Sequence, residues 1–198
     1  AKSEGRKIHL YPTYRGEHDL ELSKVLDVSC SEVNSFVSEP LIKATVALRS
    51  VKEDVEIAEI EKAVDIAHEM HTTAMKMAHP GTMEREIAGT IEGISLAKGG
   101  PVSFPIILTI NGQILHNHYH GNLLSEGRMM VTDAGAEVPT HYASDITRSV
   151  PVGGKFDSRQ KSIYEIVLEA NMKAIEHTKP GIQNKELHLM AVKTVAEG

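Results

Sequence analysis

The spacing of apolar residues changes twice along this 198-residue chain, and the change limits the folds that it can adopt. Between residues 55 and 77, apolar side chains recur mostly every three or four positions, which predicts one long helix that ends at Pro80-Gly81. Between residues 105 and 150 the apolar runs are short and β-branched, as in strands. Helical spacing returns after residue 157. Helices that flank an antiparallel sheet indicate an α+β fold.

Local signals predict where the helices begin. Ser50 and Glu53 match a capping box, which places the start of the long helix at residue 50. Thr82 is expected to cap the second helix, and Asp157 or Ser158 the third, because these side chains accept hydrogen bonds from free backbone N–H groups. The third helix is expected to bury one apolar face, formed by Ile163, Ile166, Val167, Ala170 and Ala174.

The remaining elements are shorter. A helix is expected over residues 19–26 and another from about residue 184. Strands are expected over residues 8–14, 105–110, 113–116, 128–133 and 142–150. The last two are expected to pair in an antiparallel hairpin.

Composition excludes several classes of function. With 21 Lys and Arg against 27 Asp and Glu, the net charge of −6 argues against a nucleic-acid or anionic membrane partner. Cys30 is the single cysteine, so neither a disulfide within the chain nor a cysteine-based zinc cluster can form. One thiol suits a reducing compartment, and we expect a cytoplasmic protein. No run approaches 18 consecutive apolar residues, so no membrane span is expected.

Two carboxylates fall in the predicted hairpin. Asp133 ends an apolar run, and Asp145 is expected inside the following strand. A carboxylate among apolar side chains is costly unless it is paired or binds a cation. Facing each other across two strands, the pair would suit a hard divalent cation. The alternative is that Asp133 caps a bend and Asp145 pairs with Arg148, and the residues alone leave both interpretations open.

Histidines form a second group of candidates. If residues 116–120 are extended, His116, His118 and His120 share one face, where they could bind zinc or transfer protons. The alternative is a solvated polar hairpin. His68 and His71 lie three residues apart on the long helix, without the glutamate pattern of helical zinc proteases, and we expect both at the surface.

The stretches 131–137 (VTDAGAE) and 142–148 (YASDITR) closely resemble the proline-specific pita-bread metallopeptidases, the Xaa-Pro aminopeptidase and prolidase group of family M24. The resemblance continues through residues 151–156 and 164–170, and residues 48–52 resemble the entry to the family's first catalytic-domain helix. It implies that residues 48–198 are the first half of a pita-bread catalytic domain. Residues 1–47 would then be the tail of a preceding N-terminal domain or a linker.

The resemblance also implies a chemistry. The family binds two metal ions bridged by water or hydroxide, through two aspartates, one histidine and two glutamates. Asp133 and Asp145 match the two aspartates. Manganese is the expected metal, with cobalt or zinc as alternatives. The implied reaction is hydrolysis of the bond preceding proline, in a peptide with proline at its second position.

The family's substrate-side histidine is matched by His116 when the chain is aligned to Asp133 without gaps. His118 is the rival, because His118-Tyr119 reproduces the family's His-Tyr dipeptide. The separation between Asp133 and Asp145 is one residue longer than usual, near residues 139–141. We expect the extra residue to change the tip of the hairpin and not the metal ligands.

The family's remaining histidine and glutamate ligands have no match in these 198 residues and are expected beyond them. We therefore expect a fragment that is inactive or nearly so, and that self-associates or binds its missing half through exposed apolar surface. The resemblance also implies a homo-oligomer. The main alternative is a non-catalytic binding module on the same fold. A metal-free hydrolase of the creatinase type ranks last, because those relatives lack the paired aspartates.

Overall fold

The computed structural model describes residues 5–198. The chain divides into two compact units, the first ending at Ile57 and the second beginning at Ala58. The first unit holds α1 (Gly16–Leu26), α2 (Cys30–Val33), a 3-10 turn (Asn34–Phe36) and α3 (Glu39–Ser50). The helix expected over residues 19–26 is confirmed as part of α1. The strand expected over residues 8–14 is wrong, because Leu10 alone of these residues pairs there, in an isolated parallel bridge with Val37.

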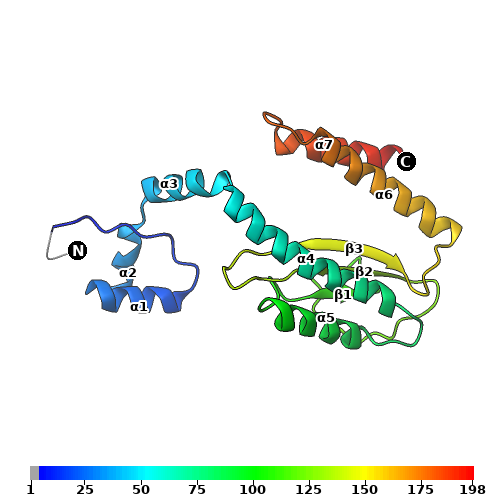
Figure 1. Ribbon diagram of the computed structural model, residues 1–198. Helices are drawn as coiled ribbons and strands as arrows, with labels where there is room; N and C mark the ends of the chain where they lie inside the picture. The colour runs from blue at the N-terminus through cyan, green and yellow to red at the C-terminus, as the bar shows by residue number, and fades with distance from the viewer. Residues whose placement is uncertain (1–4) are drawn as a thin grey trace. The chain divides into compact units, whose positions relative to one another are not determined.

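The second unit carries the sheet. Its elements are the greater part of α4 (Asp54–Met77), then α5 (Glu84–Lys98), β1 (Ile107–Thr109), β2 (Met129–Ala134), β3 (Ile146–Pro151), α6 (Ser158–His177) and α7 (Asn184–Glu197). The three strands pair antiparallel in the order β1-β2-β3, so β2 is the central strand (Figure 1). The order of helices and strands confirms the predicted α+β class.

The predicted start of the long helix is wrong. Ser50 is the last residue of α3, where its hydroxyl donates a 2.6 Å hydrogen bond to the carbonyl oxygen of Val46. A serine can bond backward within a helix in this way, so it is unavailable as the cap of the next one. The start of α4 is instead supported by Glu56, whose carboxylate accepts the N–H of Glu53 at 2.7 Å.

Two other helix starts were also predicted from capping residues. Asp157 is confirmed as the cap of α6, since its carboxylate accepts the N–H of Gln160 at 2.8 Å. Thr82 does not cap α5. Met83 occupies the cap position, and its N–H donates to the carboxylate of Glu86 at 2.8 Å.

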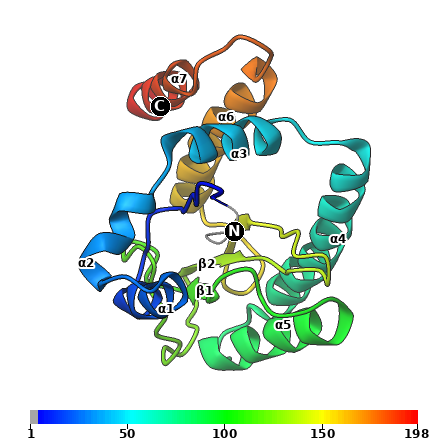
Figure 2. The ribbon, with the colours of Figure 1, turned by 90° about the vertical axis from the view of Figure 1, so that its left-hand side faces the viewer.

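The core of the second unit lies between the sheet and two helices. Figures 1 and 2 show α4 and α5 together beside the sheet. Because side chains alternate along a strand, the buried Met130 and Ala134 of β2 face these helices, and Asp133 lies on the opposite face. The buried core includes Ala63, Ile66, Met70 and Ala74 of α4, Ile87 and Ile91 of α5, and Leu108 of β1.

The apolar face predicted for α6 is only partly covered, since Ile166 and Ala174 are half-buried. Ala170 is its one buried member, whereas Ile163 is 58% and Val167 54% exposed. The expectation of a buried face is therefore wrong for this chain. The physical reason is that α6 packs mainly against α7, and that contact is not enough to cover an apolar face of this width.

Two strands are shorter than predicted, namely β1 and β3, whereas β2 has the expected length. Residues 113–116, expected as a strand, form turns instead. The strand β3 begins at Ile146, so Asp145 precedes the strand rather than lying within it. The expected antiparallel hairpin of β2 and β3 is confirmed.

Candidate metal centre

The β2–β3 hairpin continues beyond the strand ends in a single register. Ala134 pairs with Ile146 within the sheet, and Glu137 forms a bridge with Ala143 farther along. Both pairs follow the same register, which places Gly135 opposite Asp145. Asp145 lies outside the named strand, between these two pairs, and the N–H of Ser144 beside it donates to the carbonyl oxygen of Ala136 at 3.0 Å.

This register brings the two aspartates to one face. Asp133 lies opposite Thr147, and Asp145 is two residues before Thr147. Side chains two residues apart on an extended strand share a face, so Asp133 and Asp145 are diagonal neighbours. Diagonal pairs on an antiparallel ladder have Cα atoms about 7–8 Å apart, within reach of one shared ion.

Asp133 has an unusual environment for a carboxylate. It sits on the central strand between Ile107 and Thr147, and its Oδ1 atom is buried without a hydrogen-bond partner in the described residues. A buried carboxylate oxygen without a partner is costly unless a cation or water satisfies it. Its environment fits a ligand for a hard divalent cation.

Asp145 is exposed at the edge of the same face. The ion pair with Arg148 that we considered as an alternative is not among the ion pairs of residues 5–198. Instead, the Arg148 guanidinium donates to the carbonyl oxygen of Thr147 at 2.7 Å. Within the part of the chain that the structure describes, no group of three or more His, Cys, Asp or Glu side chains is arranged to hold a metal.

The residue before Asp145 joins this segment to neighbouring backbone on two sides. Ser144 is buried; its hydroxyl accepts the N–H of Ala136 at 3.0 Å, and its carbonyl oxygen accepts the hydroxyl of Ser103 at 2.6 Å. The neighbouring backbone is so close that a Cβ atom on Gly135 would lie 1.8 Å from the Ser144 carbonyl oxygen. Only glycine fits at position 135, next to both aspartates.

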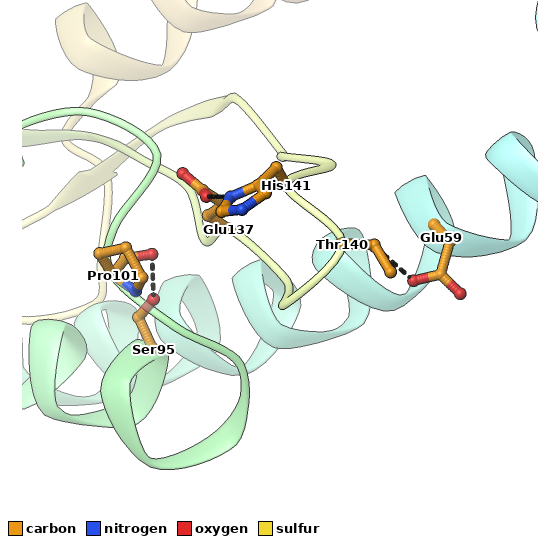
Figure 3. A network of polar contacts seen from close by, with 6 residues as sticks. All are labelled: Glu59, Ser95, Pro101, Glu137, Thr140 and His141. Carbon is orange, nitrogen blue, oxygen red and sulfur yellow. Dashed lines mark hydrogen bonds and ion pairs between the residues drawn. The ribbon is translucent and has the colours of Figure 1, made fainter.

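The tip of the hairpin, residues 139–141, contacts α4. The hydroxyl of Thr140 donates a 2.7 Å hydrogen bond to the carboxylate of Glu59, and Glu137 forms an ion pair with His141 (Figure 3). Hydrogen bonds from Lys62 and then from Thr140 lower the pKa of Glu59 below its usual value of 4.5. Figure 3 also shows Ser95 of α5 donating to the carbonyl of Pro101 at 3.2 Å, just before the strands.

The strand that would place the three clustered histidines on one face does not form, because His116 lies in a turn and residues 117–120 belong to no helix or strand. His116 is exposed, with a left-handed backbone (φ +52°), and His118 is also exposed. His120 is half-buried, and its Nδ1 atom lies 3.1 Å from the carbonyl oxygen of Leu108. The choice between His116 and His118 as the substrate-side residue stays a prediction.

Glu84 is a charged residue in the first turn of α5. It is fully buried, and its carboxylate accepts the N–H of Ile110 at 2.8 Å, the N–H of Asn122 at 3.2 Å and the Asn122 side-chain amide at 2.9 Å. These partners stand at the two ends of the segment that carries the histidines. The buried carboxylate of Glu84 thus holds the two ends of residues 110–122 together.

His71 was expected at the surface, and this expectation is wrong. It is 4% exposed, and its Nε2 atom lies 3.1 Å from the carbonyl oxygen of Ala134, the residue after Asp133. Burial lowers the pKa of His71 below its usual value of 6.5. Its spacing from Ala67 and Ala74, both on the buried face of α4, is the signal that could have revealed it. His68 is exposed, as expected.

The first unit contains a hollow that is separate from the candidate site. A hollow of about 440 Å³ is lined by residues between Arg6 and Pro40, and none of the candidate site residues lines it. No helix in residues 5–198 is long and apolar enough to cross a membrane.

Solved structures of known peptidases share this fold. Prolidase from Pyrococcus furiosus matches with a TM-score of 0.73 and 34% identity, over 78% of this chain and 46% of its own. Zinc-substituted aminopeptidase P of Escherichia coli, in complex with product, matches with a TM-score of 0.72 and 33% identity, over 76% of this chain and 34% of its own. The chain shares the pita-bread fold of these peptidases over about three quarters of its length.

Sequence comparison agrees with the fold. The profile of metallopeptidase family M24 matches residues 58–198, and the chain belongs to this family. The Xaa-Pro dipeptidase of Pyrococcus horikoshii is 35% identical over 192 residues, which cover 90% of this chain and 54% of that protein. The chain thus spans about half, or less, of the length of these relatives.

Proposed function

We propose that this chain supplies part of the active site of a peptidase that hydrolyses the bond preceding proline with the help of divalent metal ions. The main observation in support is that the Oδ1 atom of Asp133 is buried without a hydrogen-bond partner in the described residues and that Asp133 is a diagonal neighbour of Asp145. The chain also belongs to metallopeptidase family M24. The names of two relatives, an Xaa-Pro dipeptidase and an aminopeptidase P, support the choice of substrate.

Asp133 and Asp145 are the proposed metal ligands. Their oxygens suit manganese, our proposed metal, and a zinc-substituted relative supports a site that accepts more than one divalent ion. When bound, a pair of such ions supplies a Lewis acid and a bound water of lowered pKa. Asp133 is held in place by the central strand, whereas Asp145 is accessible to solvent and to substrate.

His116, with His118 as its rival, is the proposed substrate-side residue. Both imidazoles are exposed, so either can reach a peptide carbonyl or move a proton near it. The buried Glu84 fixes the ends of their segment and leaves its middle accessible.

The isolated 198-residue chain is expected to be a poor catalyst. Two carboxylates make a weak site for a divalent cation, and no third His, Cys, Asp or Glu completes such a group within residues 5–198. We propose that it binds manganese weakly and cleaves Xaa-Pro peptides slowly or not at all. We further propose that the protein is cytoplasmic and homo-oligomeric, which fractionation and light scattering of the native protein would test.

The decisive experiment uses the protein as its own cells make it, purified with an antibody against this chain. With manganese, it is expected to cleave a tripeptide with proline in second position, and to leave the matched peptide with alanine there intact. Removal of the metal by a chelator should abolish cleavage, and manganese should restore it. Binding of the proline peptide without cleavage would instead favour the non-catalytic binding module.

A further inference from the structure

His71 is a buried titratable side chain that the proposed chemistry does not use. It belongs to α4, yet its Nε2 atom lies 3.1 Å from the carbonyl oxygen of Ala134 on β2, 63 residues away in the chain. Its Nδ1 atom is buried and has no hydrogen-bond partner in the described residues. A buried polar side chain of this kind calls for an explanation.

The position of His71 relates it to both aspartates. Ala134 directly follows Asp133, and its cross-strand partner Ile146 directly follows Asp145. The carbonyl of Ile146 also acts on the imidazole and raises its pKa, although it makes no hydrogen bond with Nδ1. The contact of His71 with Ala134 therefore falls at the cross-strand pair of residues that follow the two carboxylates.

The charged groups around the imidazole explain which form is present. Burial is the largest effect on the pKa of His71 and lowers it, and the Arg148 guanidinium lowers it further. The carbonyls of Ala134 and Ile146 and the carboxylate of Asp133 act in the opposite direction. The net pKa is below 6.5, so the ring is neutral at neutral pH. Since Nε2 faces a carbonyl oxygen, we assign its hydrogen to that nitrogen.

We propose that His71 is a positioning residue, which ties α4 to the backbone beside Asp133 and Asp145 and so fixes the spacing of the two carboxylates. The predicted effect of His71 on metal binding rests on the proposed function. The predicted effect of His71 on the stability of the β2–β3 hairpin does not. Groups that orient metal ligands in this way commonly change metal affinity about 10- to 100-fold when they are removed. Packing alone would explain the burial of an apolar side chain here, but not a polar contact to the ligand strand.

Three variants of the full chain test this proposal. His71→Leu removes both nitrogens and keeps an apolar side chain in the core. His71→Gln keeps an N–H donor that can reach the Ala134 carbonyl. His68→Leu is the matched control, because His68 is exposed on the same helix.

The first readout needs no metal. In His71→Leu, amide hydrogen exchange at residues 133–134 and 145–147 should accelerate more than elsewhere in the second unit. His71→Gln and His68→Leu should stay close to the original chain. Uniform acceleration throughout the unit in His71→Leu, or equal local acceleration in His71→Gln, would overturn the proposal.

The second readout is the dissociation constant for Mn²⁺, measured by calorimetry. It should rise about 10- to 100-fold in His71→Leu and remain near its original value in His71→Gln and His68→Leu. Equal affinity in all variants would refute the proposal. If the original chain itself binds no Mn²⁺, the weak manganese site proposed for this chain fails, and the exchange measurement alone decides the role of His71.

Failure of His71→Leu to fold would move the test to the original chain. Mg²⁺ prefers oxygen ligands and leaves imidazoles alone. Titration with Mg²⁺ is expected to shift the ¹⁵N resonances of His71 and not those of His68. Unchanged His71 resonances while the Asp133 carboxyl resonance shifts would contradict the proposal. If no resonance responds to Mg²⁺, amide hydrogen exchange in His71→Gln decides. Accelerated exchange at residues 133–134 and 145–147 in that variant would count against the proposed role of His71.

Discussion

The hydroxyl of Ser144 donates a 2.9 Å hydrogen bond to the carbonyl oxygen of Ala63, and so joins the residue before Asp145 to α4. Replacement by alanine would leave the N–H of Ala136 buried without its acceptor. Ser144→Ala is expected to lower the free energy of unfolding by about 1–3 kcal/mol in urea titrations. Ser125→Ala, at an exposed serine, is the control and should change little. An equal effect of both substitutions would contradict this interpretation.

The paired aspartates predict a specific loss of metal binding. Asp133→Asn and Asp145→Asn each remove one proposed anionic ligand, so Mn²⁺ affinity measured by calorimetry should fall at least about tenfold in either variant. Asp65→Asn, on the exposed side of α4, should leave the affinity unchanged. Asp133→Asn should not destabilise the metal-free chain, because the Oδ1 atom of Asp133 makes no hydrogen bond that would be lost. Unaltered affinity in both variants would exclude this pair as the metal site.

Glu84 offers a test of the histidine segment. In Glu84→Gln one carboxylate oxygen becomes an amide that faces the donors of Ile110 or Asn122. Donors that face donors in a buried site should lower the free energy of unfolding by about 3 kcal/mol, since each unsatisfied group costs about 1–3 kcal/mol. Chemical denaturation measures this, with the exposed Glu92→Gln of the same helix as control. Equal stabilities of the two variants would show that the buried carboxylate is dispensable.

The contact between Thr140 and Glu59 predicts a dependence on pH. Because the pKa of Glu59 is lowered in the folded chain, its contribution to stability is present above about pH 4.5 and is lost as the pH falls through the lowered pKa. Thr140→Val should move that pKa partly back toward 4.5, since the larger effect of Lys62 remains. Carboxyl ¹³C titration by NMR measures the shift. Thr72→Val, whose hydroxyl donates to a backbone carbonyl instead, should leave it unchanged.

Local patterns in the sequence were enough to predict much of the fold, and also the family. The change of period predicted the order of helices and strands, and the Asp-Ala-Gly and Ser-Asp-Ile-Thr-Arg stretches predicted the family now shown by comparison. Asp157 was one of the two residues predicted as the cap of α6, and its partner, Gln160, is only three residues away. These features depend on neighbours in sequence, which is why the residues alone reveal them.

Distant contacts account for what was missed. His71 is buried by a strand 63 residues away, and Glu84 binds Asn122 from 38 residues away. Ser50 matched a capping pattern, but its hydroxyl bonds back to Val46 in a helix whose extent the sequence did not predict. In each case the decisive partner belongs to another element or to an unrecognised helix.

The continuous register of the hairpin has a consequence for how related sites are recognised. Residues added at the tip, around Thr140, lengthen the loop without moving Gly135 away from Asp145, because pairing resumes at Glu137 and Ala143. A single residue added between Asp133 and Glu137 would instead turn one aspartate to the other face of the sheet. A sequence search for this site should therefore fix the residues that flank each aspartate and leave the length of the loop between them variable.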